Sequence, residues 1–296
     1  MLLNYHEPLF RPPSEANSLI FQVTLGCSFN RCSFCVMYKT KTYSEKPLEQ
    51  VLSEIDRMAF LGPQIEKVFL ADGDALNLPT SHLLAILAHL HERFPRLRQV
   101  SCYALPGNLK KKSLSELRDL RAAGLSLIYY GIETGSPKLL KRIVKGATPE
   151  IMITGLNKAS DAGLRISATV ILGLGGKHLW KEHMTGTIAL INQVRLDYLS
   201  TLQLFLHDSV RDAFIQHFEK QGDVFVPQDD PGILTEQYHL ISGINPAQSL
   251  EFRSNHASNA LPLKGRLPDD KAHLLKLVEA GQSGHIPLRP KAYRAM

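Results

Sequence analysis

The sequence lacks the features that mark membrane, secreted and repeat proteins. No apolar run approaches the length that crosses a bilayer. The first residues mix charges and prolines and contain no apolar signal-peptide core. Only four cysteines are present, three of them crowded together, which does not suggest a disulfide framework. There is no internal repeat and no low-complexity tract. We therefore expect a cytoplasmic globular protein with no membrane partner.

The composition narrows the class of partner only slightly. Of the 296 residues, 44% are hydrophobic and 21% are charged, which is typical of a globular chain. The net charge of +6 suits anionic substrates but does not single out nucleic acid. The only basic block, at 110–112, is expected to be a solvated helix start. A nucleic-acid partner is therefore disfavoured.

The crowded cysteines are Cys27, Cys32 and Cys35. No second pair completes a four-ligand zinc site, because Cys102 stands alone far along the chain. Three thiolates suit an iron–sulfur cluster in which one iron keeps a position for another ligand. A zinc site completed by His6 or another histidine, or three reduced core thiols, also agrees with the spacing.

Six apolar runs predict strands that alternate with helical patterns. They span residues 19–25, 67–71, 99–103, 126–130, 165–172 and 198–204. This alternation favours parallel pairing, in a closed or partly closed βα barrel or in an open doubly wound sheet. Both folds place their chemistry at the carboxyl ends of the strands. The segments found there are the cysteine cluster, Asp72-Gly73-Asp74, Glu133 and the glycines of 173–176. Their shared position predicts a catalytic rim.

This pattern resembles the radical SAM superfamily over roughly residues 19–204. The resemblance implies an α/β fold, a partial (βα)6 TIM-type barrel with a mainly helical C-terminal extension. We expect an N-terminal arm at 1–18, the barrel core at 19–205, and an extension at 206–296 that closes the barrel. The implied activity is reductive cleavage of S-adenosylmethionine (SAM) at a [4Fe–4S] cluster. The resulting 5′-deoxyadenosyl radical abstracts hydrogen from a substrate. The electron comes from a donor such as flavodoxin or ferredoxin.

The resemblance also assigns site residues position by position. It makes Cys27, Cys32 and Cys35 the cluster ligands. The implied SAM contacts are Met37 or Tyr38 near adenine, Asp72, Gly73 and Asp74 at the amino group, Glu133 at the ribose, Arg142 or Lys145 at the carboxylate, Ser167, and Gly173 near adenine.

Two details depart from the commonest pattern of the superfamily. The spacing here is Cys-x4-Cys-x2-Cys, with four residues rather than three in the first gap. The position two after Cys35 is usually aromatic and is here Met37, with Tyr38 beside it. Longer gaps resemble known variant subgroups. The segments 71–76 and 253–259 resemble one uncharacterised bacterial branch, which supplies no substrate.

Polar residues on the later strands are the expected substrate contacts. Thr169, Thr201 and Gln203 alternate with apolar neighbours and are predicted to face inward. His207 and His256 are candidate catalytic proton carriers.

The polar segment that contains His256 is expected to close the barrel mouth through Asn255, Ser258 and Asn259. No second cysteine run follows residue 205, which disfavours maturases with auxiliary clusters. The expected substrate is a small molecule or a peptide side chain. Competing functions are a non-catalytic iron–sulfur or zinc-binding protein and a radical SAM nucleic-acid modification enzyme. The sequence does not determine the oligomeric state.

Overall fold

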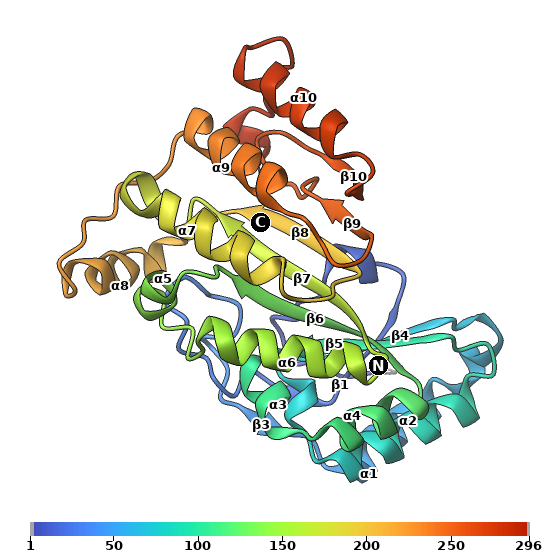
Figure 1. Ribbon diagram of the computed structural model, residues 1–296. Helices are drawn as coiled ribbons and strands as arrows, with labels where there is room; N and C mark the ends of the chain where they lie inside the picture. Colours follow the sequence, from blue (N-terminus) through green and yellow to red (C-terminus); the bar gives the residue numbers. More distant parts are fainter. Residues whose placement is uncertain (1–2, 295–296) are drawn as a thin grey trace. The chain divides into compact units, whose positions relative to one another are not determined.

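The computed structural model describes residues 3–294 and shows strands alternating with helices (Figure 1). The strands are β1 (Leu19–Gln22), β2 (Thr24–Leu25), β3 (Ser44–Glu45), β4 (Lys67–Ala71), β5 (Gln99–Ala104), β6 (Leu125–Glu133), β7 (Arg165–Leu172), β8 (Tyr198–Gln203), β9 (Leu250–Arg253) and β10 (Lys264–Leu267). The α-helices are α1 (Leu48–Arg57), α2 (Thr80–Arg93), α3 (Pro106–Lys111), α4 (Leu114–Ala122), α5 (Pro137–Arg142), α6 (Pro149–Asp161), α7 (Gly176–Ile191), α8 (Asp208–Glu219), α9 (Asp230–Gly243) and α10 (Lys271–Gln282). Short 3-10 turns are η1 (Pro13–Glu15), η2 (Ala59–Gln64), η3 (Ala75–Asn77) and η4 (Lys291–Tyr293).

The main sheet has the strand order β1-β4-β5-β6-β7-β8-β9-β10, and β2 and β3 form a separate two-stranded ribbon. The pairs β1–β4, β4–β5, β5–β6, β7–β8 and β8–β9 are parallel. The last pair of the main sheet, β9–β10, is antiparallel. The predicted α/β class and its parallel pairing are therefore confirmed.

All six predicted strands are present, the first of them as β1 and β2, and residues 3–294 contain three more that the sequence analysis did not predict: β3, β9 and β10. The segment around residue 252 looked polar and without periodicity, yet it begins with β9. In β9, Leu250 and Phe252 are buried while Glu251 and Arg253 are partly exposed. This alternation spans only four residues, too few to stand out in the sequence.

The chain forms two compact units. The first contains the residues up to Asn30, Cys35–Tyr130 and Lys158–Ile166. The second contains Arg31–Phe34, Gly131–Asn157 and the chain from Ser167 onward. Helix α2 contacts α1 and α4 in the first unit, whereas α9 contacts α7 and α10 in the second.

Helix starts follow the capping signals of the sequence. The Ser113 hydroxyl accepts the Glu116 N–H at 3.1 Å, and the Glu116 carboxylate accepts the Ser113 N–H at 2.8 Å. This reciprocal pair is a capping box. Ser136 caps α5 by accepting the Leu139 N–H at 3.3 Å, and Pro137 occupies the first helical position. Local chemistry therefore decides where these helices begin.

The N-terminal arm is anchored in the first unit by Glu15, which has no exposed surface. Its carboxylate accepts hydrogen bonds from Ser101 Oγ at 2.8 Å, Tyr129 Oη at 2.6 Å and Gln99 Nε2 at 3.2 Å. The Ser18 hydroxyl also donates to it. These donors compensate the desolvation of a buried carboxylate, which is costly when unpaired. The arm is thus part of the packed structure.

In the second unit, Gly135 and Gly186 bring the loop after β6 against α7. A Cβ on Gly135 would lie 2.6 Å from the Gly186 carbonyl carbon. The Gly135 N–H also donates to Thr187 Oγ1 at 2.9 Å. No side chain fits between these backbones without displacing one of them.

We expect Gly135→Ala to lower the free energy of unfolding by about 1–3 kcal/mol, because the added methyl overpacks this contact. Urea unfolding followed by circular dichroism measures the change. Gly107→Ala is the matched control, since a Cβ at this exposed position in α3 meets nothing within 4 Å. Equal stability of the two variants would contradict the argument.

Candidate active site

The two ends of the cysteine loop are held together by the pairing of β2 with β3. Strand β2 pairs with β3, so the chain between Leu25 and Ser44 forms a loop anchored at both ends. Gly26 begins it with φ +70°, a conformation that favours glycine. Cys27, Cys32 and Cys35 on this loop are all partly exposed, whereas Cys102 is buried in β5.

Backbone groups already meet the sulfur of the first cysteine. The Asn30 N–H lies 3.4 Å from Cys27 Sγ and donates to it. Such bonds stabilise thiolate and cluster sulfur. Cys27 and Cys35 belong to the first unit and Cys32 to the second. Among residues 3–294, no three cysteine, histidine or acidic side chains are gathered as a ready metal site. The cluster ligand set therefore stays a prediction.

Asp72 closes the base of the loop from the end of β4. Its Oδ2 accepts the Gly26 N–H at 3.0 Å and lies 2.7 Å from Lys41 Nζ. Asp72 has no exposed side-chain surface, and Lys41 keeps only 8% of its own. One carboxylate therefore holds both ends of the segment that carries the thiols. Its second oxygen, Oδ1, has no hydrogen-bond partner among residues 3–294.

The ring of Tyr38 packs directly against Gly73. A Cβ on Gly73 would lie 2.7 Å from Tyr38 Cδ2, so only glycine leaves room for the ring. Tyr38 is 4% exposed and packs edge-on against Phe10. Met37 is partly exposed. Of the two residues considered for the adenine contact, Tyr38 is buried against Gly73, whereas the side chain of Met37 is more exposed.

Asp74 is the second buried carboxylate after β4. It has no exposed surface, and the Ser28 hydroxyl donates to its Oδ2. Burial raises the pKa of Asp74 to about 6, although hydrogen bonds from Ser28 and Asn108 oppose the rise. Like Asp72, it has an Oδ1 to which no described residue donates a hydrogen bond. Two orphaned acceptors beside the loop base suit a ligand that donates several hydrogen bonds, such as an ammonium group.

In the second unit, Glu133 ends β6 in a strained conformation with φ +63°. Its Oε1 lies 2.9 Å from Lys145 Nζ, and both side chains are nearly buried. A Cβ on Gly131 would lie within 3.0 Å of the Glu133 carboxyl carbon and of Lys145 Nζ. Non-glycine residues with positive φ at strand ends often mark ligand sites. The two residues predicted to meet the ribose and the SAM carboxylate are thus neighbours.

Arg142 has a different environment from Lys145. Its Nε donates to Asp223 Oδ2 at 2.7 Å, and it also donates to the Gln221 side chain. Arg142 therefore fixes the end of α5 to the segment after α8. Arg142 and Lys145 are thus both paired with a carboxylate, and the contact of either with a SAM carboxylate stays a prediction. Ser167, the weaker SAM candidate, is 8% exposed on β7.

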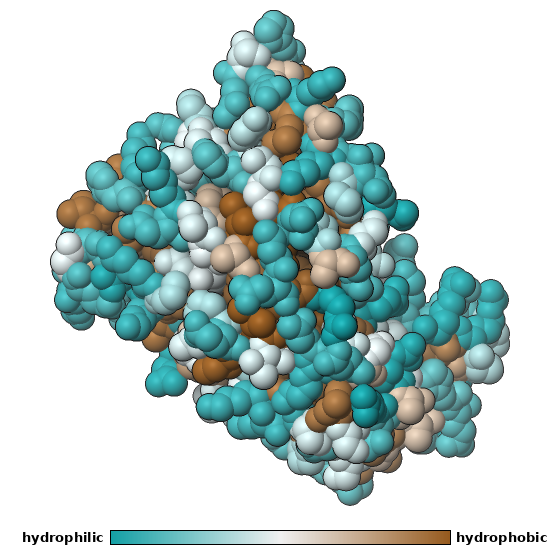
Figure 2. Space-filling model, in the orientation of Figure 1, coloured by the Kyte–Doolittle hydropathy of each residue, from teal (hydrophilic) through white to brown (hydrophobic). Residues whose placement is uncertain are grey.

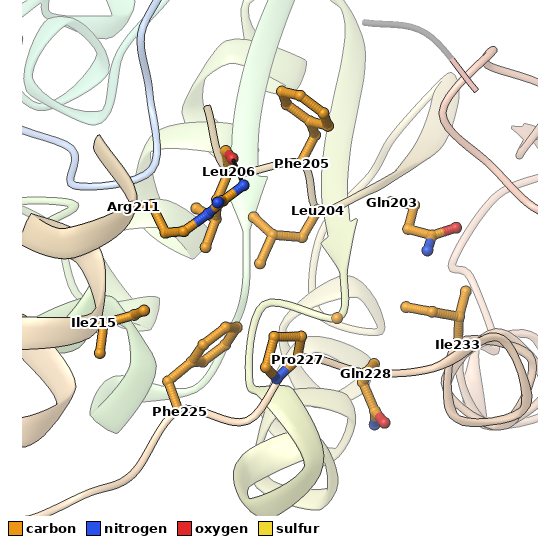
Figure 3. A pocket seen from close by; sticks show the side chains of 11 residues that line it. Gln203, Leu204, Phe205, Leu206, Arg211, Ile215, Phe225, Pro227, Gln228 and Ile233 are labelled. Carbon is orange, nitrogen blue, oxygen red and sulfur yellow. Dashed lines mark hydrogen bonds between the residues drawn. The ribbon is translucent and has the colours of Figure 1, made fainter. Parts of the chain in front are cut away.

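Gly173 borders a cavity of about 440 Å³ in the second unit, also lined by Gln203, Phe205 and Ile233 (Figure 3). Gly173 has φ +81°, and its N–H donates to Glu236 Oε2 at 2.6 Å. Hydrophobic side chains also gather on the surface over the segment between α8 and α9 (Figure 2). Exposed Val224 belongs to that segment.

Glu236 is a site residue that the sequence analysis missed. It has no exposed surface, and burial raises its pKa to about 7. Gln228 Nε2 donates to its Oε1 at 3.1 Å. A signal existed: Glu236 lies three residues after Ile233 and four before Leu240, on the apolar face of α9.

The two histidines predicted to carry protons each accept a hydrogen bond from a backbone N–H two residues further along the chain. His207 is exposed, and its Nδ1 accepts the Ser209 N–H at 3.1 Å at the start of α8. His256 Nδ1 accepts the Ser258 N–H at 3.1 Å. Burial and nearby Arg289 lower the pKa of His256, so its ring is neutral at pH 7. These hydrogen bonds are local and do not test a catalytic role, so the role of each histidine in proton transfer stays a prediction.

The segment after β9 is tied to β8. Asn259 Nδ2 donates to the Thr201 carbonyl at 2.7 Å, and the Gln203 N–H donates to Ser258 Oγ at 3.2 Å. Asn255 is exposed. These bonds place the segment at the carboxyl end of β8, where it was expected to close the mouth.

The predicted common facing of Thr169, Thr201 and Gln203 is wrong. Register pairs Thr169 with Ser200, so Thr201 lies on the opposite face of the sheet. Thr201 Oγ1 donates to Ser254 Oγ at 2.6 Å, and Ser254 Oγ accepts from Gln237 of α9 at 2.7 Å. Thr201 and Gln203 therefore share the face that α9 covers. Strand alternation alone does not say which alternate set faces a helix.

The comparison with known families decides the assignment. The sequence profile of the Radical SAM superfamily matches residues 21–188, more than half of the chain. The chain belongs to the radical SAM superfamily. Members of this superfamily are enzymes that bind a [4Fe–4S] cluster and SAM and need an electron donor.

Named relatives extend over different parts of the chain. A candidate methylthiotransferase of Methanocaldococcus jannaschii is 24% identical over 98% of this chain and 60% of its own length. The 4′-phospho-dehydrooxetanocin synthase of Priestia megaterium is 26% identical over 52% of this chain and 23% of its own length. A biotin synthase of Yersinia pestis is 27% identical over 57% of this chain and 48% of its own. The chain thus spans less than two thirds of each of these relatives.

Solved structures share the fold. Coproporphyrinogen III oxidase of Escherichia coli, a radical SAM enzyme, gives a TM-score of 0.56 at 20% identity, over 76% of this chain and 52% of that chain. Methylornithine synthase gives 0.52 at 11% identity, over 88% and 68%. These likenesses support the radical SAM type of barrel-like α/β fold. No helix in residues 3–294 is both long and apolar enough to cross a bilayer.

We expect Lys41→Met to lower the free energy of unfolding by about 3 kcal/mol, because it leaves the buried Asp72 carboxylate without its partner. Adding Asp72→Asn should recover at least half of the loss. Lys39→Met is the control, since Lys39 is exposed and donates only to the Asn30 carbonyl among the described residues. Chemical unfolding of all four proteins tests this, and equal effects at positions 39 and 41 would oppose it.

We expect the stability of the protein to fall as the pH rises from about 5 to 8, through ionisation of Glu236. The folded-state pKa lies above the ordinary value, so the protonated form stabilises the fold and its loss costs about 2–3 kcal/mol. Glu236→Gln should flatten this dependence. Urea unfolding across the pH range measures it, with exposed Glu219→Gln as control. A slope unchanged in Glu236→Gln would argue against the assignment.

Proposed function

We propose that the protein is a radical SAM enzyme in which Cys27, Cys32 and Cys35 hold a [4Fe–4S] cluster. The observation that carries the proposal is the position of these thiols. They lie on the loop between β2 and β3, within the segment matched by the superfamily profile, and Asp72 holds both ends of this loop. When bound, the cluster and SAM supply a 5′-deoxyadenosyl radical that abstracts hydrogen from a substrate, one electron coming from a flavodoxin or ferredoxin.

The residues of the first unit fit the amino group of SAM. Asp72 and Asp74 each have a buried Oδ1 with no hydrogen-bond partner in the described part of the chain, so both can accept from an ammonium group. The Lys41 ammonium already neutralises part of the Asp72 charge. Asp74, with a pKa of about 6, is mostly ionised at pH 7 and is the stronger acceptor. The Ser28 hydroxyl orients its other oxygen.

The residues of the second unit fit the rest of SAM. Glu133 presents a carboxylate for the ribose hydroxyls, and Lys145 beside it presents a cation for the SAM carboxylate. Their ion pair holds both side chains in place before the ligand arrives, which lowers the entropy lost on binding. Each unit therefore offers groups that suit one part of SAM.

The substrate is proposed to be a small molecule or a peptide side chain. The named relatives include a biotin synthase and a 4′-phospho-dehydrooxetanocin synthase, whose names describe small-molecule products. The protein is proposed to act in the cytoplasm, where thiols stay reduced. Its division into an arm at 1–18, a core at 19–205 and an extension at 206–296 is likewise part of the proposal.

We expect Cys27→Ala, Cys32→Ala and Cys35→Ala each to abolish [4Fe–4S] binding after anaerobic reconstitution. The loss follows because two remaining sulfurs do not hold the cluster. Iron and sulfide content, visible absorbance and release of 5′-deoxyadenosine measure it. Cys102→Ala is the matched control, because this thiol is buried in β5. It should keep the cluster and the SAM cleavage.

Two outcomes would overturn the proposal. One is a full cluster with SAM cleavage in any of the three loop variants. The other is stoichiometric zinc and no SAM affinity in wild-type protein purified without oxygen, which would identify a non-catalytic metal-binding protein instead.

A further inference from the structure

Four strands of the second unit carry one row of polar register partners. Thr169 on β7 pairs with Ser200 on β8, and Ser200 pairs with Arg253 on β9. Arg253 then pairs with Lys264 on β10. These strands lie side by side in the sheet (Figure 1). Register partners point to the same face, about 4.8 Å apart. Two hydroxyls, a guanidinium and an ammonium therefore form a line across the sheet.

This row lies on the face opposite α9. The neighbouring residue Thr201 points toward α9, and its hydrogen bond to Ser254 marks that covered face. The row itself remains accessible. The Arg253 side chain is 31% exposed and that of Lys264 is 63% exposed. Thr169 and Ser200 are also partly exposed. A ligand can reach all four side chains from one side.

Arg253 is held in a fixed orientation. Its Cζ lies 4.8 Å from the centroid of the Tyr198 ring, a cation–π contact. Nε and Nη2 each lie 2.9 Å from Glu251 Oε1. Within residues 3–294, no protein acceptor is bonded to Nη1, and neither row hydroxyl makes a hydrogen bond. The donors of the row are therefore placed in advance and still available.

The charge of this face is positive. Glu251 is the carboxylate that Arg253 and Lys264 share, the latter at 3.4 Å. The register partner of Glu251 on β10 is another cation, Arg266. Three cations thus surround one carboxylate. Hydroxyl and guanidinium donors next to excess positive charge select an oxyanion and disfavour a cation.

We propose that the row Thr169–Ser200–Arg253–Lys264 binds an oxyanion, a carboxylate or a phosphate, of the substrate. Arg253 Nη1 and the Ser200 hydroxyl donate to the anion. The Thr169 hydroxyl, one strand further, meets the adjoining polar part of the ligand. Only the description of this ligand as a substrate rests on the proposed radical SAM function. Anion binding itself needs neither cluster nor SAM.

The test titrates the purified, cluster-free full chain with inorganic phosphate and separately with acetate, at constant ionic strength. Isothermal titration calorimetry gives the affinity of each anion. We expect one of them to bind wild type and Arg253→Gln to weaken its binding about tenfold or more, the loss of roughly one charge-assisted bond. Ser200→Ala should weaken it severalfold. Whichever anion binds decides between phosphate and carboxylate substrates.

Arg96→Gln is the matched control, because Arg96 is an exposed arginine, outside the second unit, that also pairs with a carboxylate, Glu66. It should bind the anion as wild type does. Equal loss in Arg253→Gln and Arg96→Gln, or no binding of either anion to wild type, would overturn the proposal.

Two further variants separate the possible causes of a loss. Arg253→Lys keeps the charge but not the planar fork, and it should show an intermediate affinity. Full affinity in this variant and in Ser200→Ala would contradict the assigned donors. Cys27→Ala should bind the anion normally, so failure of the cluster assignment leaves this result unaffected.

Discussion

A single buried carboxylate ties the cysteine loop to the sheet. Asp72 accepts from the Gly26 N–H at one end of the loop and from Lys41 at the other. Burial of a charge is unfavourable unless it is paired and hydrogen-bonded, and here both conditions hold. The loop therefore cannot move independently of the end of β4. The residues that follow, Gly73 and Asp74, share its support, and the Tyr38 ring packs on Gly73.

In the second unit, an ion pair and a strained backbone position lie together at Glu133. The chain leaves β6 with positive φ, and the missing side chain of Gly131 makes room for the Glu133–Lys145 pair. Such strain persists only where neighbouring contacts compensate it. The geometry keeps a carboxylate and an ammonium group adjacent and nearly buried. Electrostatic interactions of a ligand with either group are stronger there than in water.

Local sequence signals predicted much of the fold and part of the candidate site. Apolar runs located the strands, because this pattern depends on neighbours close in sequence. The helix caps at Ser113 and Ser136 are equally local features. The facing of Thr201 was mispredicted, since it depends on α9, which lies far along the chain. Glu236 was missed because one acid on an apolar helix face stands out only when its partner, the Gly173 N–H, is known. The register row also requires four strands to be aligned.

The N-terminal arm has a consequence for how the first unit admits ligands. Glu15 is the common acceptor for Ser101, Tyr129 and Gln99, which come from β5 and β6. Withdrawal of the arm would strand these donors together, at a cost that no single exposed contact imposes. The arm therefore covers the part of these strands that Glu15 contacts. A molecule entering there would have to displace Glu15 and break three hydrogen bonds.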